Sequence, residues 1–299
     1  MADSNNMSDL WKRLRFVLIG IIVYRIGTHI PIPGIDPQRL SSLFDQNQGT
    51  ILELFNLFSG GALERMSIFA LNVVPYISAA IIMQLFSNSI PYLIELKKDG
   101  QAGRNAITQY TRYGTVLLAF IQASALAVTL SSGGLAYNPG TAFFVSAVFS
   151  VVAGTIFLMW LGEQISERGI GNGISIIIAT SILTGIPSAI GQALEQARQG
   201  DLNILMLLSI GVLAMVVIAV VVFIERGQRR ITVNYAQRQQ GRKLMQAQAS
   251  HLPFKVNMAG VIPAIFASTF LLFPASLSTW FGQGENFAFL QSISLALNP

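Results

Sequence analysis

The sequence contains no cysteine and only two histidines among its 299 residues. Without cysteine the chain has no disulfide framework, no thiol nucleophile and no thiolate ligand for zinc. Neither His29 nor His251 has a second histidine or a carboxylate at metal-ligand spacing, so we expect no metal site. No catalytic constellation is found either, and we expect neither an enzyme nor a bound cofactor.

Charged residues are also scarce. They make up 11% of the sequence, whereas an ordinary soluble domain has roughly 25%. Hydrophobic residues make up 52% and gather in runs of about 20, the length that a helix needs to cross the hydrocarbon layer. Because such a chain lacks the polar residues to cover a globular surface, the composition predicts an all-α polytopic membrane protein.

Seven apolar segments are predicted to lie in the membrane. They cover residues 14–30, 73–94, 113–130, 142–161, 173–190, 204–224 and 258–281. The first resembles a signal peptide because basic residues precede it, but Arg25 interrupts the run and no A-x-A-like cleavage site follows. We therefore expect a retained first helix. The run "GIGNG" at residues 169–173 follows no strand, so it is no dinucleotide fingerprint and is expected to cap the next helix.

The distribution of lysine and arginine predicts the orientation of these segments. Fifteen of the nineteen cations fall in connections on one side, which is therefore the cytoplasmic side. This places residues 1–13 and a long basic loop, residues 225–256, in the cytoplasm, and residues 282–299 outside. The charge of the loop suits three roles that composition does not separate: fixing the topology, attracting anionic lipid, or docking an acidic partner such as ribosomal RNA.

One segment is broken before it can span the membrane. In residues 54–71 two glycines, Gly60 and Gly61, precede a short helix-forming piece that carries an expected ion pair between Glu64 and Arg65. Irregular backbone at membrane depth has to be buried in protein or line a watery cavity. The break therefore indicates a pore lining or a binding site, and a kinked ordinary helix remains the alternative.

Three side chains in or beside the apolar runs have two interpretations each. Ile77 and Ile81 share one helix face, where they would either pack ordinarily or form an apolar constriction of the kind that closes channels by dewetting. Arg25 is a charge inside the first apolar run, near its outer end. It is either functional or extended toward the membrane surface, and the sequence leaves this open. Aspartate and glutamate are missing from the uninterrupted runs, which argues against a proton-coupled pump.

Several long motifs stand out along the chain, among them "YRIGTHIPIPGID", "LFNLFSGGALERMSIFALNVVPYISAAIIMQL", "FLMWLGEQISERGIGNGISII" and "ERGQRRITVNYAQRQQGRK". These motifs resemble the SecY family of bacterial protein-translocation channel subunits, and the similarity extends over essentially the whole chain. The resemblance implies a helical channel with pseudo-symmetric halves. It also implies that the chain holds the first seven of the family's ten helices, and so is truncated after helix 7.

The resemblance assigns roles to four sets of residues. It implies a plug and its hinge at Gly60, Gly61, Glu64, Arg65, Met66 and Phe69. It implies a hydrophobic pore ring at Ile77, Ile81, Ile178, Ile182 and Phe270, the last standing where an aliphatic residue is expected. It implies a lateral gate that includes Gln84, Ser87, Asn257 and Pro263. Finally, it implies a docking surface for the ribosome or the SecA ATPase at Arg226, Arg229, Arg230, Arg238, Arg242 and Lys243.

The resemblance also implies partners and a location. The partners are the SecE and SecG subunits, SecA, the ribosome, signal sequences, nascent polypeptides and membrane lipids, and the location is the bacterial inner membrane. Two other classes compete with a passive channel. A secondary transporter would need a charged or cation-coordinating midplane site, which the sequence does not offer. A scaffold without transport would not be distinguished by ribosome binding, but it would make no contact between a polypeptide and Ile81.

Overall fold

A computed structural model describes residues 3–36, 39–40, 56, 59–200, 203–233, 239–240, 243–244 and 250–257. The chain divides into two compact units, the first holding Met1–Ala189 and the second Ile190–Ser268, with the boundary inside one helix. Each unit is described by itself. The predicted segments 258–281 and 282–299 lie outside the described residues, as do Pro263 and Phe270.

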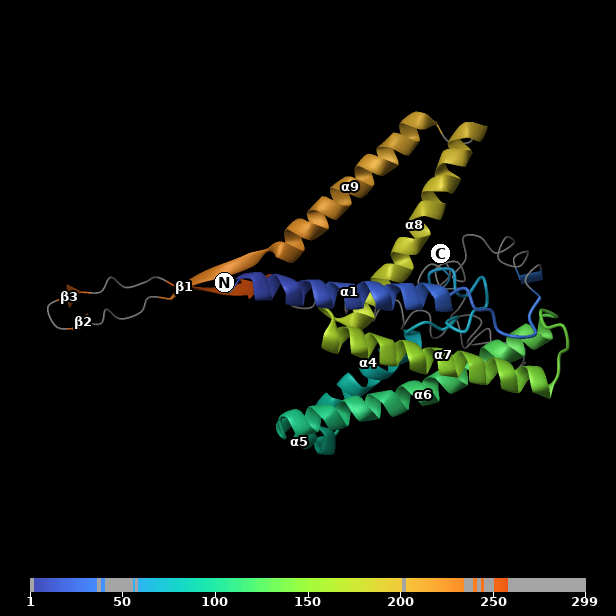
Figure 1. The fold of residues 1–299 in the computed structure, drawn as a ribbon, viewed down its shortest axis with the longest axis horizontal. Coiled ribbons are helices and arrows are strands. Elements are labelled where there is room, and N and C mark those ends of the chain that lie inside the picture. Colours follow the sequence, from blue (N-terminus) through green and yellow to red (C-terminus); the bar gives the residue numbers. More distant parts are fainter. Residues whose placement is uncertain are drawn as a thin grey trace. The chain divides into compact units, whose positions relative to one another are not determined.

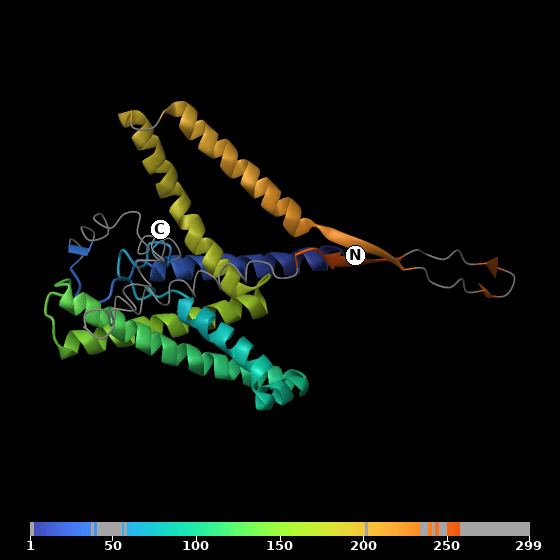
Figure 2. The ribbon, with the colours of Figure 1, turned by 180° about the vertical axis from the view of Figure 1, so that it is seen from behind.

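Helices make up the first unit. They are α1 (Asp3–Gly27), α4 (Val74–Ser89), α5 (Pro91–Lys98), α6 (Gln101–Ser132), α7 (Thr141–Arg168) and the first part of α8 (Gly173–Gln199). In this unit α6 packs along α7 and α4 packs against α6, while α1 lies against α7 (Figure 1; Figure 2). The predicted cap before α8 is confirmed, because the side chain of Asn172 accepts hydrogen bonds from the amides of Ile174 and Ser175 at 3.0 and 3.3 Å.

Small residues allow these helices to approach closely. Ala119, Ala123 and Ala127 recur every fourth residue on α6 and are buried in one core cluster with Ala147 and Val151 of α7. A second cluster joins α1, α7 and α8 with the residues between α1 and α4. Its buried members include Tyr24, Phe69, Leu158, Ile165 and Ile177. Both clusters are built on α7, which is therefore the central helix of the first unit.

Four described helices, α6 to α9, are long and apolar enough to cross a membrane. A fifth span results if α4 and α5 count as one, although they are bent by 94° where Ile90 precedes Pro91. The predicted span 73–94 is thus two helices in the structure, as expected where proline follows an extended residue. The helices also extend past the predicted apolar segments: α6 begins twelve residues before the segment 113–130, because the hydrocarbon layer limits only the apolar part of a helix.

The second unit contains α9 (Ile204–Arg226) and two short antiparallel pairs. Strand β1 (Gln228–Val233) pairs with β4 (Ser250–Lys255), and β2 (Gln239–Gln240) pairs with β3 (Lys243–Leu244). These strands lie within the basic loop predicted at residues 225–256, for which no strands were predicted. The Ile-Thr-Val run at the end of β1 is the local signal for them, since β-branched residues favour strands.

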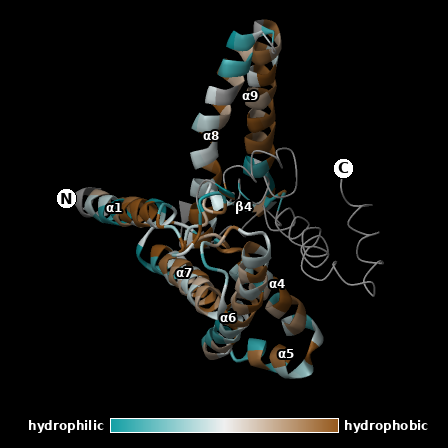
Figure 3. Cartoon of the chain, turned by 90° about the vertical axis from the view of Figure 1, so that its right-hand side faces the viewer, coloured by the Kyte–Doolittle hydropathy of each residue, from teal (hydrophilic) through white to brown (hydrophobic). Residues whose placement is uncertain are grey.

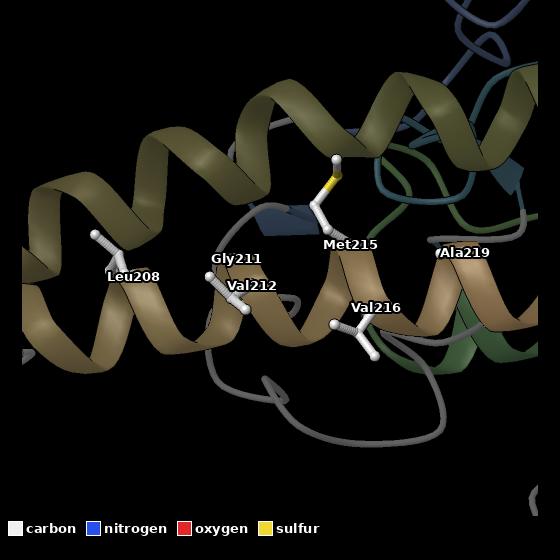
Figure 4. A pocket seen from close by; sticks show the side chains of 6 residues that line it. All are labelled: Leu208, Gly211, Val212, Met215, Val216 and Ala219. Carbon is white, nitrogen blue, oxygen red and sulfur yellow. The ribbon is translucent and has the colours of Figure 1, made fainter.

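Helix α9 is apolar on all sides (Figure 3). None of its described side chains is buried, and a shallow groove runs along one side of it (Figure 4). The groove is lined by Leu208, Gly211, Val212, Met215, Val216 and Ala219. A helix that is hydrophobic all round belongs in a membrane or a large core, so α9 is a membrane helix by its own composition.

Candidate functional site

The broken segment of the sequence forms a succession of turns, which we call the turn segment (residues 59–73). Where the sequence led us to expect a short half-helix, the structure has left-handed backbone at Gly60, Gly61, Met66 and Asn72, with φ of 66°, 77°, 42° and 50°. Left-handed residues cannot continue a right-handed helix, which is the reason for the difference. The predicted residues before position 59 lie outside the description, except Asn56.

Most backbone hydrogen bonds of the turn segment stay within it. Examples are Met66 N to Leu63 O at 3.0 Å, Ala70 N to Ser67 O at 2.9 Å and Asn72 N to Phe69 O at 2.8 Å. Two backbone bonds connect it to the chain after α1. Ile32 N donates to Met66 O at 2.8 Å and Ile68 N donates to Ile30 O at 3.0 Å, on either side of the bridge between Pro31 and Ser67.

Apolar side chains of the turn segment are buried between helices. Met66 and Ala70 are buried in the cluster of α6 and α7, whereas Phe69 is buried in the cluster of α1, α7 and α8. The ring of Phe69 stacks between Tyr24 and Phe157, with centroid distances of 6.1 and 5.9 Å. The predicted plug residues Met66 and Phe69 therefore anchor the segment instead of facing a water-filled space.

Two helix glycines make room for the turn segment. A Cβ atom at Gly27 of α1 would overlap the ring of Phe69, and one at Gly154 of α7 would overlap the backbone carbonyl of Ile68. Glycine is the residue that permits such a close approach of two backbones. The helix surfaces on both sides of the turn segment are therefore matched to its shape.

A buried polar junction joins α1, the turn segment and α8. Its members are Tyr24, Ser59, Asn72 and Ser181, none of which is more than 3% exposed. The Tyr24 hydroxyl lies 2.6 Å from Ser181 Oγ and 3.2 Å from the Ser59 carbonyl oxygen. The Asn72 amide donates to Ser181 Oγ at 3.1 Å. Hydrogen bonds thus connect both ends of the turn segment to the same place on α8.

Cationic side chains line the outer edge of the turn segment. Arg25, whose role the sequence left open, donates to the Gly60 carbonyl at 3.3 Å and so contacts the hinge. Arg65 donates to the Gly61 carbonyl at 3.0 Å and lies 2.7 Å from His29 Nε2. Because His29 Nδ1 lies 2.9 Å from the Arg25 carbonyl, that nitrogen donates and Nε2 accepts from Arg65.

The expected ion pair between Glu64 and Arg65 is not made in the described part of the chain. Glu64 instead bonds twice to Asn56: the Asn56 amide donates to Glu64 Oε2, and the Glu64 amide donates to Asn56 Oδ1, both at 3.0 Å. The side chains of adjacent residues point in different directions on a compact turn, as they do on a helix. The expected ion pair between Glu64 and Arg65 was therefore wrong.

The four described residues of the expected pore ring are half-buried on α4 and α8. Ile77 and Ile178 pack against the same buried cluster as Phe69, which brings α4, α8 and the turn segment together. Ile81 and Ile182 lie one helical turn further along on the same two helices.

The expected gate and docking residues fall in both units. On α4 the Ser87 hydroxyl donates to the Gln84 carbonyl at 2.8 Å. In the second unit the Asn257 amide donates to Glu225 at 3.1 Å. Of the docking residues, Arg226 is in the last turn of α9, Arg229 and Arg230 are exposed on β1, and Lys243 is in β3, while Arg238 and Arg242 lie outside the described residues.

The contacts of Tyr24, Gly154 and Ser181 were not predicted from the sequence. Their only sequence signal is a polar or very small residue within an apolar run, and it does not name a contact partner. His29 was noted only as a non-ligand. Among the described residues no group of three or more histidines or acidic residues is placed to hold a metal ion.

The chain is similar in sequence to proteins of one known family. A SecY family profile matches residues 67–298. The protein translocase subunits SecY of Pseudomonas aeruginosa and Escherichia coli K12 are 62% and 58% identical over 99% and 100% of the chain. The chain spans about two thirds of each relative, 67% and 68%. These relatives are named as translocase subunits, a class that is not enzymatic.

Three solved structures share the fold. One is described as a protein conducting channel, with a TM-score of 0.65 and 21% identity over 90% of this chain and 59% of its own. Another has a TM-score of 0.64 and 21% identity over 90% of this chain and 59% of its own, and concerns the SecY plug domain, said to stabilise the closed channel and maintain a membrane seal. The third is Sec61 in a canine ribosome-channel complex, with a TM-score of 0.64 and 19% identity over 90% of this chain and 60% of its own. The likeness confirms the predicted channel fold, and the chain belongs to the SecY family.

Proposed function

We propose that this chain forms the channel part of a protein translocase, through which unfolded polypeptides cross the membrane and membrane helices pass sideways into it. The observation that carries the proposal is the position of the turn segment, which is buried against α1, α7 and α8 beside Ile77 and Ile178. A segment of turns in that position would block a conduit along α4 and α8. A solved structure that shares the fold is described as having a plug domain that stabilises the closed channel and maintains a membrane seal.

In this mechanism the turn segment is the plug, hinged at Gly60 and Gly61. Its displacement exposes a constriction formed by Ile77, Ile81 and the isoleucines of α8. Aliphatic side chains contact a passing chain without directional bonds, so they seal around any sequence. An empty apolar constriction also excludes water and ions. Gln84, Ser87, Asn257 and Pro263 are proposed to border the lateral exit.

The proposed setting is the bacterial inner membrane with the N-terminus in the cytoplasm. The strong bias of lysine and arginine to one side supports this orientation. SecE and SecG subunits, SecA, signal sequences and lipids are proposed as partners by family membership. In this proposal the chain and its partner subunits together form the conduit and its seal.

The crosslinking test uses the absence of native cysteine. This chain would be continued by the part of the Pseudomonas aeruginosa relative that lies outside the alignment, with any cysteine in that part replaced by serine, and Ile81→Cys introduced. We call this product the chimera. A secretory polypeptide with one cysteine is then stalled partway across. We expect a disulfide that depends on the signal sequence and on the stall position, because Ile81 lies in the proposed constriction.

The matched control is Ile82→Cys on the next position of α4, which is 39% exposed and points about 100° away around the helix. It should crosslink weakly at every stall position. If the chimera assembles but no stall position ever crosslinks to position 81, the chain is not a polypeptide channel, and a scaffold role takes its place.

The β1–β4 hairpin is the proposed docking surface for the ribosome or SecA. Arg229 and Arg230 are exposed on β1, and their cross-strand neighbours are Phe254 and Pro253. The surface therefore combines cations with exposed apolar groups, among them Ile231 and Leu252. Cations favour the phosphates of RNA, and contacts of this kind weaken as salt rises.

Reversing two charges tests this surface. We expect Arg229→Glu with Arg230→Glu to lower the affinity of the chimera for ribosomes at least about tenfold and to flatten its dependence on salt, because two phosphate contacts are lost. Binding is measured by cosedimentation over a range of salt concentrations. The control is Lys12→Glu with Arg13→Glu, which changes the same charge on α1. Equal losses in both variants would show that net charge, and not the hairpin, binds the ribosome.

A further inference from the structure

The buried junction of Tyr24, Ser59, Asn72 and Ser181 has no part in the proposed conduit, yet it joins three elements that the mechanism has to separate. The hydroxyl of Ser181 is its centre. It lies 2.6 Å from the Tyr24 hydroxyl, 3.1 Å from the Asn72 amide nitrogen and 2.9 Å from the Ile177 carbonyl oxygen. The hydroxyl accepts from Asn72, and its single proton goes either to the Tyr24 hydroxyl or to the Ile177 carbonyl. When it goes to Tyr24, the Tyr24 proton is free to donate to the Ser59 carbonyl.

The junction holds the two ends of the turn segment together. Tyr24 contacts the Ser59 carbonyl at the start of the segment, and Asn72 lies near its end. Gly60, with φ of 66°, packs directly on α8, where a Cβ atom would lie 3.1 Å from the Ser181 Cα. Because Ser181 is fully buried, water does not replace these bonds while the segment remains in place.

The position of Ser181 on α8 couples the junction to the constriction. Ser181 directly precedes Ile182 and follows Ile178 by three residues, so all three belong to one turn of a continuous helix. A rigid helix cannot carry these isoleucines outward without also moving Ser181 away from Tyr24 and Asn72. Widening the constriction and releasing the turn segment are therefore one event in this geometry.

We propose that Ser181, bonded to Tyr24 and Asn72, is a latch that holds the turn segment closed and opens when α8 moves outward. The inference rests on the proposed function of the turn segment as a plug. It assigns an uncharged, buried control point that lies on α8, outside the plug itself.

The test measures how often the turn segment leaves its position when no substrate is present. A single cysteine replaces Leu63, which is 9% exposed, in the chimera. The protein is placed in lipid nanodiscs, where both membrane faces are open to solution, and the rate of labelling by a water-soluble maleimide is followed. We expect Ser181→Ala and Tyr24→Phe each to raise the rate at least roughly three- to tenfold, the range for one buried hydrogen bond, because each variant removes one or more of the bonds that hold the turn segment.

A matched control separates the latch from a general loss of a hydroxyl. Ser150→Ala makes the same substitution on α7, where the Ser150 hydroxyl donates to the Ser146 carbonyl of its own helix at 2.7 Å. It should label at the parental rate. Because Tyr24 and Ser181 share one hydrogen bond, the double variant should label more slowly than the product of the two single effects predicts.

The proposal is overturned if Ser181→Ala labels at the rate of Ser150→Ala, or if the two single effects simply multiply. If Ser181→Ala fails to assemble, Tyr24→Phe carries the test, since it removes a single oxygen and keeps the stacked ring. No polypeptide is present in this experiment. The labelling experiment can therefore be interpreted even if the crosslinking test at Ile81 fails. Equal labelling rates would overturn the latch and leave the proposed channel function unaffected.

Discussion

Replacing Gly154 with alanine is expected to displace the turn segment and to make the resting channel conduct ions. A Cβ atom at this position of α7 would overlap the carbonyl oxygen of Ile68, a backbone atom that cannot move unless the segment moves. Overpacking of this kind costs about 1–3 kcal/mol. If that cost falls on the closed state, the open population rises roughly five- to 160-fold. The conductance of the chimera in a planar bilayer, without substrate, measures it.

The control for this experiment is Gly211→Ala on α9, where a Cβ atom would meet nothing within 4 Å. It makes the same chemical change in another membrane helix and should leave the resting conductance unchanged. Gly27→Ala on α1 should act like Gly154→Ala, since its Cβ atom would overlap the ring of Phe69. If both variants of the contacting glycines stay sealed, the turn segment does not close the channel.

Removing one partner of the ion pair between Arg112 and Glu163 should lower the free energy of unfolding more than removing a partner of an exposed ion pair. Arg112 Nε and Nη2 donate to the two carboxylate oxygens of Glu163, both at 2.8 Å, and so join α6 to α7. The Glu163 side chain is 19% exposed and that of Arg112 46%. Partial exposure reduces the penalty of a lone buried charge, so we expect Arg112→Ala to lower the free energy of unfolding by about 1–3 kcal/mol.

Unfolding of the chain in mixed micelles, titrated with a denaturing detergent, measures this loss. The exchanged pair, Arg112→Glu with Glu163→Arg, should recover much of it, because opposite charges again face each other. Lys12→Ala is the control: its pair with Asp9 is more than two thirds exposed on both sides and should contribute less than about 0.5 kcal/mol. Equal losses for Arg112→Ala and Lys12→Ala would mean that the contact between α6 and α7 does not depend on its charges.

The membrane class and the family could be predicted from the sequence because both depend on long local patterns. Apolar runs determine where helices can cross a membrane, and motifs such as "SGGALERMSIFAL" are specific by their length. The pairing of β1 with β4 could not be predicted in the same way. Its register joins residues such as Gln228 and Lys255, which are separated by the whole basic stretch.

The internal structure of the candidate site was harder to predict for the same reason. Tyr24 and Ser181 are 157 residues apart, and nothing in either neighbourhood indicates the other. The glycines at positions 27 and 154 reveal their purpose only when the turn segment lies against them. The charged neighbours Glu64 and Arg65 suggested a contact with each other, although backbone direction sends them to different partners.

The local hydrogen bonds of the turn segment determine how it can open. Its turns bond mainly within themselves, and around the bridge at Ser67 two backbone hydrogen bonds join it to Ile30 and Ile32. The segment can therefore leave as one folded piece, with little newly exposed backbone to be solvated. Opening of the proposed plug is then expected to be a hinged motion of the kind that runs in microseconds to milliseconds, not a local unfolding. Reclosure of the proposed plug would need no refolding step, so the seal would re-form between one passing polypeptide and the next.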